Sequence, residues 1–268
     1  MVDPHFAAFS FVDRIADFES GVRARGVFTI PPHIASFPPS LVAEAVGQLA
    51  AWTAMDKIGF RGRPVAALAN ETRFHGAVRP GDTLELAVEI ESCDDEAVAY
   101  AGSASVDGRL LIELVDCLGP MLPVADFDAP EALVARLALL RGEGAAPGRF
   151  GGIEPIRVEP IAGERGAATL HVPASAPFFA DHFPRRPVFP ATLMLDALIG
   201  LATQVAPPGY VPALLTHVKV RSFTEPGAVL RIEAVPNAAD PTRIQLSARA
   251  GDRTVATARL QTCTQDKA

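Results

Sequence analysis

The chain has 268 residues, 49% of them hydrophobic, and a formal net charge of −7 at neutral pH. An acidic chain without a basic stripe is not expected to bind nucleic acid, and no uncharged apolar run is long enough to span a bilayer. Its three cysteines form no CxxC pair, so neither a zinc site nor a disulfide framework is expected. With no signal-peptide pattern at the start, these features predict a cytoplasmic protein of one or two domains.

The first half of the sequence predicts strands, then one long helix, then more strands. Strands are expected over 9–15 and 22–30, and a proline-rich loop follows. An almost wholly apolar stretch predicts a helix over about 39–55, which should be buried because apolar residues surround it on all sides. Alternating polar and apolar residues, as in 83–90, then predict half-buried antiparallel strands.

The segment between the halves predicts a short helix and a linker. Asp128 is a good N-cap, Pro130 suits the first turn, and the helix should end near residue 140. The glycine-rich stretch 141–152 that follows is typical of a linker.

The second half repeats the order of elements in the first. A helix is predicted over 191–205, where it meets the breaker sequence PPG at 207–209, and strands such as 229–234 follow. Each half is therefore predicted to be an antiparallel sheet wrapped around a long central helix, an α+β arrangement.

Two proline-aromatic segments, 152 residues apart, are diverged copies of each other. The dipeptide Phe-Pro occurs at 37–38 and again at 189–190, and Glu44 corresponds in the same register to Asp196. The second copy contains His182, whereas the first has an isoleucine, Ile30, at the matching place. This pattern suggests two similar domains that share one working site.

Glu44 and Asp196 are the only carboxylic acids inside these apolar helices. Burial disfavours the charged form of a carboxyl group, so the pKa of each should rise, which suits a general acid. The alternative is a carboxylate that hydrogen-bonds backbone amides at a helix start. Because the same anomaly occurs twice at the same place, we favour a functional role.

His182 lies in a stiff, proline-rich loop just before the second helix. The functional interpretation is a general base that removes a proton next to a carbonyl group, and the alternative is a loop histidine bonded to backbone. The helix start at Ala191 and Thr192 offers N–H groups that could polarise that carbonyl, although an ordinary helix start has them too. His33 is a weak candidate. The remaining histidines show no acidic partner at an informative sequence spacing: His5, His75, His171 and His217.

The sequence HFPRRPVFPATLMLDA at 182–197 resembles the active-site motif of β-hydroxyacyl-acyl-carrier-protein dehydratases of the FabZ and FabA type. Segments 9–15, 37–45 and 73–82 are similar to other parts of the same family. The resemblance implies two fused hotdog domains, a double hotdog that forms a pseudo-dimer within one chain, which could stay monomeric or form a further homo-oligomer. Its expected parts are a first hotdog over 1–127, a connecting helix and linker over 128–152, and a second hotdog over 153–268.

In that family the active site is composite, with the histidine from one hotdog and the acid from the partner's central helix. The resemblance therefore implies that His182 faces Glu44, whereas Asp196 faces Ile30 in a vestigial site. It also implies that the carbonyl and substrate contacts come from the loop and helix start around the histidine. These positions are Phe183, Pro190, Ala191 and Thr192.

Two residues depart from the family pattern. Ala191 stands where the family usually has glycine; it keeps the N–H but adds a methyl group, which could tighten the pocket. Asp181 stands where glycine usually precedes the histidine, and this carboxylate could alter the pKa of the imidazole.

The activity implied is dehydration of a 3-hydroxyacyl thioester to the trans-2-enoyl thioester. No metal or redox cofactor is expected, since the substrate carries its own phosphopantetheine arm on an acyl carrier protein or as a CoA thioester. Arg185 and Arg186 could contact an acidic carrier protein or the phosphate, or could simply be a solvated charged loop. The alternatives are another hotdog enzyme, an isomerase or a thioesterase, and a non-catalytic acyl-binding protein. Acyl chain length and pathway stay open.

Overall fold

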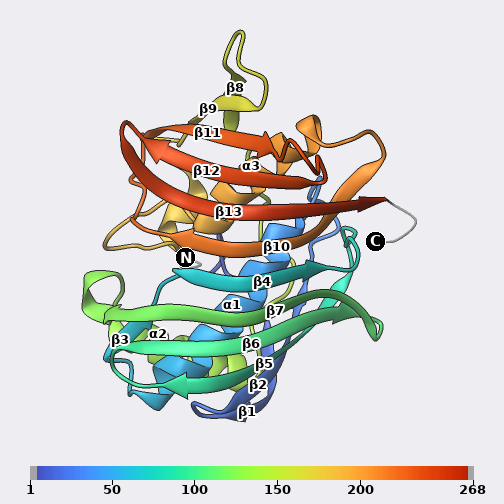
Figure 1. Ribbon diagram of the computed structural model, residues 1–268. Helices are drawn as coiled ribbons and strands as arrows, with labels where there is room; N and C mark the ends of the chain where they lie inside the picture. The colour runs from blue at the N-terminus through green and yellow to red at the C-terminus, as the bar shows by residue number, and fades with distance from the viewer. Residues whose placement is uncertain (1–4, 265–268) are drawn as a thin grey trace.

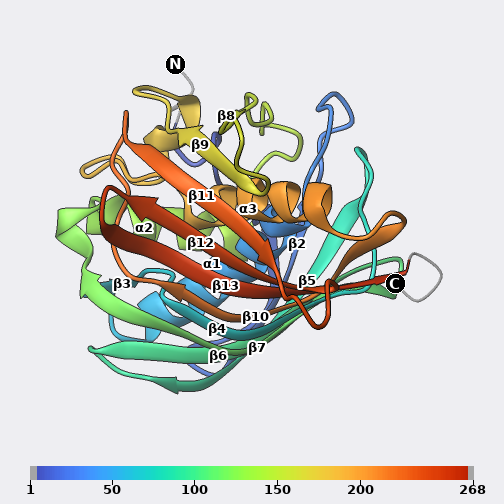
Figure 2. The same ribbon diagram turned by 45° about the horizontal axis from the view of Figure 1, so that its top comes forward.

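The computed structural model describes residues 5–264. Two long helices, α1 (Pro39–Lys57) and α3 (Ala191–Val205), lie on the same side of one large antiparallel sheet, which curves around them (Figures 1 and 2). Both helices occur where the sequence predicted them. Proline at the first position of α1 fixes a helical φ and lacks only an N–H that would have no partner inside the helix.

The sheet consists of two six-stranded halves joined edge to edge. The strands of the first half are β1 (Arg14–Glu19), β2 (Arg23–Thr29), β4 (Leu68–Phe74), β5 (Thr83–Cys93), β6 (Ala97–Val106) and β7 (Arg109–Pro123), with the short β3 (Gly62–Pro64) paired to β7. The strands of the second half are β8 (Arg157–Pro160), β9 (Ala167–His171), β10 (Tyr210–Val220), β11 (Val229–Pro236), β12 (Arg243–Ala250) and β13 (Arg253–Thr264). The strand order is β1-β2-β5-β6-β7-β4-β10-β13-β12-β11-β9-β8, so each half has the same order, reversed about the β4–β10 pair. This is a double hotdog, as predicted.

The β4–β10 pair joins the halves into one continuous sheet. Its antiparallel register runs from Arg73 opposite Leu214 to Leu68 opposite Lys219. The first turns of α1 and α3 are hydrogen-bonded to each other through Ser40 and Asp196 and through Thr192 and Glu44, so the two central helices meet near their starts.

Each central helix packs on the sheet of its own half. Leu49 of α1 and Leu198 of α3 are completely buried, and burial of a leucine side chain stabilises the fold by about 1.5–3 kcal/mol. Gly102 of β6 permits a close approach of α1, because a Cβ atom there would lie 2.6 Å from a methyl group of Val46. The core therefore lies between the helices and the concave face of the sheet.

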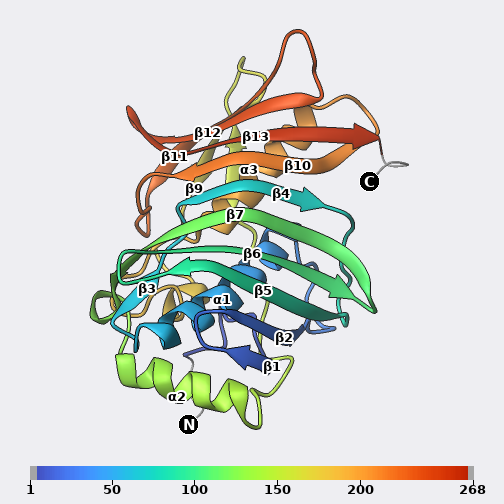
Figure 3. The ribbon, with the colours of Figure 1, turned by 60° about the horizontal axis from the view of Figure 1, so that its bottom comes forward.

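The connecting segment forms α2 (Pro130–Arg141), which packs beside β1 at the outer end of the first half (Figure 3). Its N-cap is Ala129, not Asp128 as predicted, because the Asp128 carboxylate is buried and pairs with Arg63. The glycine-rich stretch that follows is anchored by Phe150, whose ring lies edge-on to Phe11 with the ring centroids 5.0 Å apart. The domain boundaries given above stay a prediction.

The strand predicted over 9–15 is also corrected, since β1 begins only at Arg14. Asp13 still donates its N–H to the carbonyl oxygen of Val27 in β2, but side chains accept the N–H groups of residues further upstream. The N–H of Phe9 donates to Asp181 and the N–H of Phe11 donates to Gln48. Among the helices formed by residues 5–264, none combines the length and apolarity needed to cross a membrane.

Candidate active site

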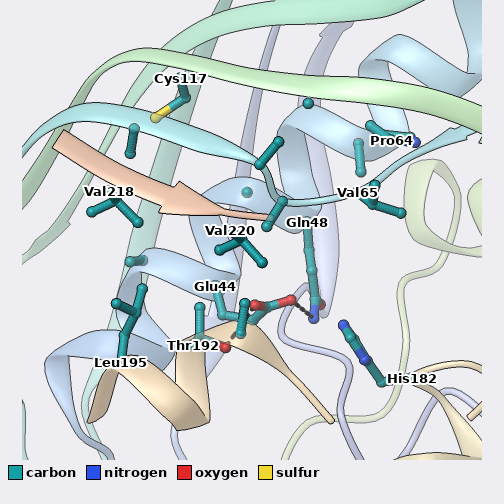
Figure 4. Close-up of a pocket in the computed structure, with 18 of the residues that line it drawn as sticks. Glu44, Gln48, Pro64, Val65, Cys117, His182, Thr192, Leu195, Val218 and Val220 are labelled. Atoms are coloured by element: carbon teal, nitrogen blue, oxygen red, sulfur yellow. Dashed lines mark hydrogen bonds between the residues drawn. The ribbon is translucent and has the colours of Figure 1, made fainter. Parts of the chain in front are cut away.

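A cavity of about 210 Å³ lies between the central helices and the sheet, at the junction of the two halves. Its polar corner contains Glu44 and Gln48 from α1, Thr192 from α3, and His182 from the loop before α3 (Figure 4). The rest of its wall is mostly apolar. Labelled examples in Figure 4 are Val65, Cys117, Leu195, Val218 and Val220.

Glu44 is held by one residue from each half of the chain. The Thr192 hydroxyl donates to its Oε2 at 2.8 Å, and Nε2 of Gln48, one turn further along α1, donates to its Oε1 at 3.1 Å. These two bonds fix the carboxyl group at the cavity wall. Because a hydroxyl can donate or accept, Thr192 can bond to either protonation state of the acid.

His182 is oriented by its backbone contact and by two aromatic rings. Its Nδ1 lies 3.1 Å from the carbonyl oxygen of Val188, an acceptor, so the proton of a neutral ring belongs on Nδ1. The Phe183 ring stacks on the imidazole at 4.2 Å between centroids, and the Phe9 ring meets it edge-on at 5.4 Å. Nε2 is then the nitrogen that can accept a proton. In Figure 4 the ring is directed toward Glu44 and Gln48.

The electrostatics of the site favour a neutral imidazole. Burial lowers the pKa of His182 below its ordinary value; the nearby charge of Glu44 opposes this shift, and the Arg63 guanidinium adds to it. A histidine with a lowered pKa is unprotonated at neutral pH and is ready to act as a base.

The start of α3 presents an amide to the same cavity. Pro190 is the N-cap, and its carbonyl oxygen accepts from the N–H groups of Leu193 and Met194. Within residues 5–264 the N–H of Ala191 has no hydrogen-bond partner, and Ala191 lines the cavity. An unpaired N–H at the positive end of a helix can stabilise a developing negative charge on oxygen.

The structure shows a reciprocal pair of hydroxyl–carboxyl bonds that the sequence analysis did not identify. Thr192 of α3 donates to Glu44 of α1, and Ser40 of α1 donates to Asp196 of α3 at 3.2 Å. Ser40 precedes Thr192 by 152 residues, the same spacing that relates Glu44 to Asp196. This shared spacing of two hydroxyl residues was the signal in the sequence that could have predicted the paired bonds.

The surroundings of Asp196 nevertheless differ from those of Glu44. Pro39 stands in the register of Ala191 and has no N–H to offer, and Ile30 is completely buried in the apolar core. Burial raises the pKa of Asp196, while the Ser40 bond opposes that shift. Of the described residues, those that line the cavity include neither Asp196 nor Ile30, and their predicted opposition stays a prediction.

Arg185 and Arg186 are exposed beside the site. Arg185 donates to the carbonyl oxygen of Ala125 at 3.0 Å, whereas the Arg186 guanidinium lies over the ring of Phe223, 5.0 Å from its centroid. Phe223 lines the cavity, so Arg186 is at its rim. Their contact with a carrier protein or phosphate stays a prediction.

Three of the four histidines that lacked an evident acidic partner in the sequence have one in the structure. His75 lies 2.9 Å from Glu113, and His171 lies 2.9 Å from Glu159, in both cases across paired strands at the surface. The third, His5, is half-buried near two carboxylates: its Nε2 lies 3.1 Å from Asp128, and its Nδ1 lies 3.3 Å from Asp181. Strand pairing and loop packing create these contacts, which sequence spacing does not reveal.

Comparison with known proteins places this geometry in a family. The model of FabA-like domains matches residues 4–114, and the model of ApeI dehydratases matches residues 160–259. The 3-hydroxyacyl-[acyl-carrier-protein] dehydratase FabZ of Bacillus subtilis is 34% identical over 129 residues, which are 43% of this chain and 92% of that protein. The chain belongs to the FabZ/FabA dehydratase family. FabZ of Bacillus velezensis is 35% identical over 121 residues, which are 41% of this chain and 86% of the relative.

Solved structures support the fold of this FabZ-family chain over nearly its full length. An acyl-ACP thioesterase from Bacteroides thetaiotaomicron superposes with a TM-score of 0.58 and 10% identity, and covers 90% of this chain and 98% of the thioesterase. The 12:0-ACP thioesterase from Umbellularia californica has a TM-score of 0.57 and 10% identity, and the match covers 92% of this chain and 99% of the thioesterase. At such low identity the likeness shows the double-hotdog arrangement alone.

Proposed function

We propose that this FabZ-family protein dehydrates a 3-hydroxyacyl thioester to the trans-2-enoyl thioester at a single composite site. The observation that carries the proposal is the placement of His182 and Glu44, which come from different halves and face one cavity (Figure 4). One is oriented as a base through its Nδ1 contact, and the other is held by two hydrogen bonds.

In the proposed reaction, Nε2 of His182 takes the α proton of the substrate. The electron pair of the broken Cα–H bond forms the Cα–Cβ double bond as the Cβ–O bond breaks. Glu44 gives a proton to the departing hydroxyl, which leaves as water. The proton on the imidazolium then returns to the Glu44 carboxylate, so the site regains its starting state. General acid–base groups of this kind typically each contribute about 10²–10⁴-fold to the rate.

The Ala191 N–H would stabilise the thioester oxygen while the α proton leaves. One amide donor aimed at an oxyanion is typically worth about 10²–10³-fold in rate. The reaction therefore needs a base, an acid and an N–H donor from the protein, and the proposal includes no metal or redox cofactor.

The substrate is proposed to enter on a phosphopantetheine arm carried by an acyl carrier protein. Ser222 and Thr224 line the cavity, and their buried hydroxyls have no partner within residues 5–264, so they are available to the amides of such an arm. Outside them, Arg186 at the rim and its neighbour Arg185 would meet the phosphate or the acidic carrier. A CoA thioester carries the same arm and is the alternative substrate.

The first experiment measures enoyl thioester formation by wild type, Glu44→Gln and Asp196→Asn on carrier-protein and CoA substrates. Asp196→Asn is the matched control, because it makes the same acid-to-amide change at the equivalent position of the other helix. We expect kcat to fall about 10²–10⁴-fold in Glu44→Gln and to stay near wild type in Asp196→Asn. Equal losses, or a loss in Asp196→Asn alone, would overturn the single-site assignment.

The same assay separates the other activities. Release of free thiol without enoyl product would indicate a thioesterase, and conversion of a trans-2-enoyl substrate to a positional isomer would indicate an isomerase. Inactive wild type on both kinds of thioester, with binding retained, would indicate an acyl-binding protein.

A further inference from the structure

The segment from His5 to Phe11, here called the N-terminal segment, contacts the loop that carries His182 through a single carboxylate. Asp181, the residue before the histidine, accepts hydrogen bonds from the N–H groups of Phe6, Ala8 and Phe9, the last two at 2.8 and 2.7 Å. The Ser10 hydroxyl adds a fourth donor at 3.2 Å. One side chain therefore fixes most of this segment.

The same segment also contacts the acid of the proposed site. Nε2 of Gln48 donates to the carbonyl oxygen of Phe9 at 3.0 Å, and its Oε1 accepts from the N–H of Phe11 at 2.8 Å. That Nε2 also donates to Glu44. The backbone of Phe9 is thus bonded to Asp181 on its N–H side and to Gln48 on its carbonyl side.

The side chain of Phe9 completes the connection by packing on the base. Its ring is 2% exposed and lies edge-on to the His182 imidazole, at 74° between the ring planes. It shields one side of the imidazole from water and limits its rotation. An unbroken series of contacts then runs from Glu44 through Gln48 and Phe9 to His182.

Asp181 is expensive to bury and is retained in spite of that cost. Its side chain is 3% exposed, so its charge must be balanced by donors and by a cation. His5 lies at 3.3 Å, and the Arg63 guanidinium lies nearby over the ring of Phe183, which itself stacks on His182. A buried carboxylate with this many partners specifies one conformation of the loop.

We propose that Asp181 is a positioning residue, which fixes the N-terminal segment so that Phe9 and Gln48 hold His182 and Glu44 in their reacting geometry. This inference rests on the proposed function, because the catalytic purpose of the geometry depends on it. The contacts themselves are independent of the substrate, so they can be tested without it.

The test compares wild type, Asp181→Asn and Asp181→Ala by NMR titration of the His182 ring, kcat and KM against pH, and thermal unfolding. Without the carboxylate, Phe9 is released and water reaches the imidazole. We then expect the measured His182 pKa to rise and the acid limb of kcat to move to higher pH. We also expect kcat to fall about 10- to 100-fold, because a displacement of the reacting groups by about 1 Å typically costs this much, and KM to change less. Asp181→Asn, which keeps one acceptor oxygen, should lie between wild type and alanine.

Asp13→Asn is the matched control. Asp13 is also partly buried and accepts a backbone N–H, that of Thr29 at 2.7 Å, but it does not line the cavity. We expect it to leave the His182 titration and kcat unchanged. If Asp181→Ala is poorly folded, Asp181→Asn and Phe9→Leu, which keeps the backbone bonds of Phe9, carry the comparison.

A lower unfolding temperature in the Asp181 variants, with an unchanged His182 titration and an unchanged kcat, would overturn the positioning role. Failure of the proposed function looks different: wild type would form no enoyl thioester, while the NMR titration would still report whether Asp181 sets the surroundings of His182.

Discussion

Replacement of His5 by glutamine should remove a contribution to stability that depends on pH. Burial alone would lower the pKa of His5, but hydrogen bonds and charge from Asp128 and Asp181 outweigh it and raise the pKa from 6.5 to about 9. At about 1.4 kcal/mol per pKa unit, this shift contributes at most roughly 3 kcal/mol to the free energy of unfolding. The His5 side chain is 14% exposed and the residue is only half-buried, so solvent screening keeps the actual contribution to stability below this limit.

The sign of the effect follows from the raised pKa. The folded protein binds the proton more tightly than the unfolded chain, so the contribution is fully present below pH 6.5 and is lost as the pH rises through about 9. Urea unfolding of wild type and His5→Gln at pH 6 and pH 10 measures it. We expect the difference in unfolding free energy to shrink by up to roughly 3 kcal/mol between the two values.

His75→Gln is the control for this experiment. His75 is 38% exposed on its side chain and pairs with Glu113 at the surface, so its replacement should change stability by less than about 1 kcal/mol at either pH. A wild-type advantage over His5→Gln that is constant with pH, or that grows as the pH rises, would refute the reasoning.

Three further predictions concern the cavity and the buried charges. Because burial lowers the pKa of His182, the acid limb of the kcat–pH profile should lie below about pH 6.5, and a limb above pH 7 would contradict the assignment. Gly47→Leu should fill the cavity beside α1, where even a Cβ atom would lie 3.2 Å from the Tyr100 hydroxyl. In an assay over a series of acyl chain lengths, activity should therefore fall for long chains first. Equal losses at all lengths would argue against acyl binding there. Asp128→Ala should lower the unfolding free energy by about 1–3 kcal/mol, measured by urea titration, since it leaves the half-buried Arg63 cation without this partner. A loss well below about 1 kcal/mol would show that water replaces the carboxylate.

The sequence was sufficient to predict the elements that depend on local patterns. The long apolar runs predicted both central helices, which lie at Pro39–Lys57 and Ala191–Val205. The repeat of one motif predicted two similar halves, which the strand order confirms. The helices follow from local hydrophobic patterns, which act between near neighbours in the chain.

The contacts that hold the site were not predictable in this way, because they join residues far apart in sequence. Asp181 and Phe9 are separated by 172 positions, and Asp128 was interpreted as a helix cap because its sequence neighbours permit one. Its partner Arg63 comes to it only when β3 pairs with β7. A polar residue in a loop has several local uses, and the tertiary fold selects among them.

The β4–β10 junction has a consequence for how the protein behaves in dilute solution. Since the two groups proposed to react, His182 and Glu44, belong to one polypeptide, the two halves cannot dissociate, and their effective concentration for each other does not depend on how much protein is present. Specific activity should therefore stay constant on serial dilution, where a catalyst assembled from separate subunits would lose it. A covalent link also lets one copy of the motif accumulate changes while the other is retained, because the two are no longer encoded by the same residues.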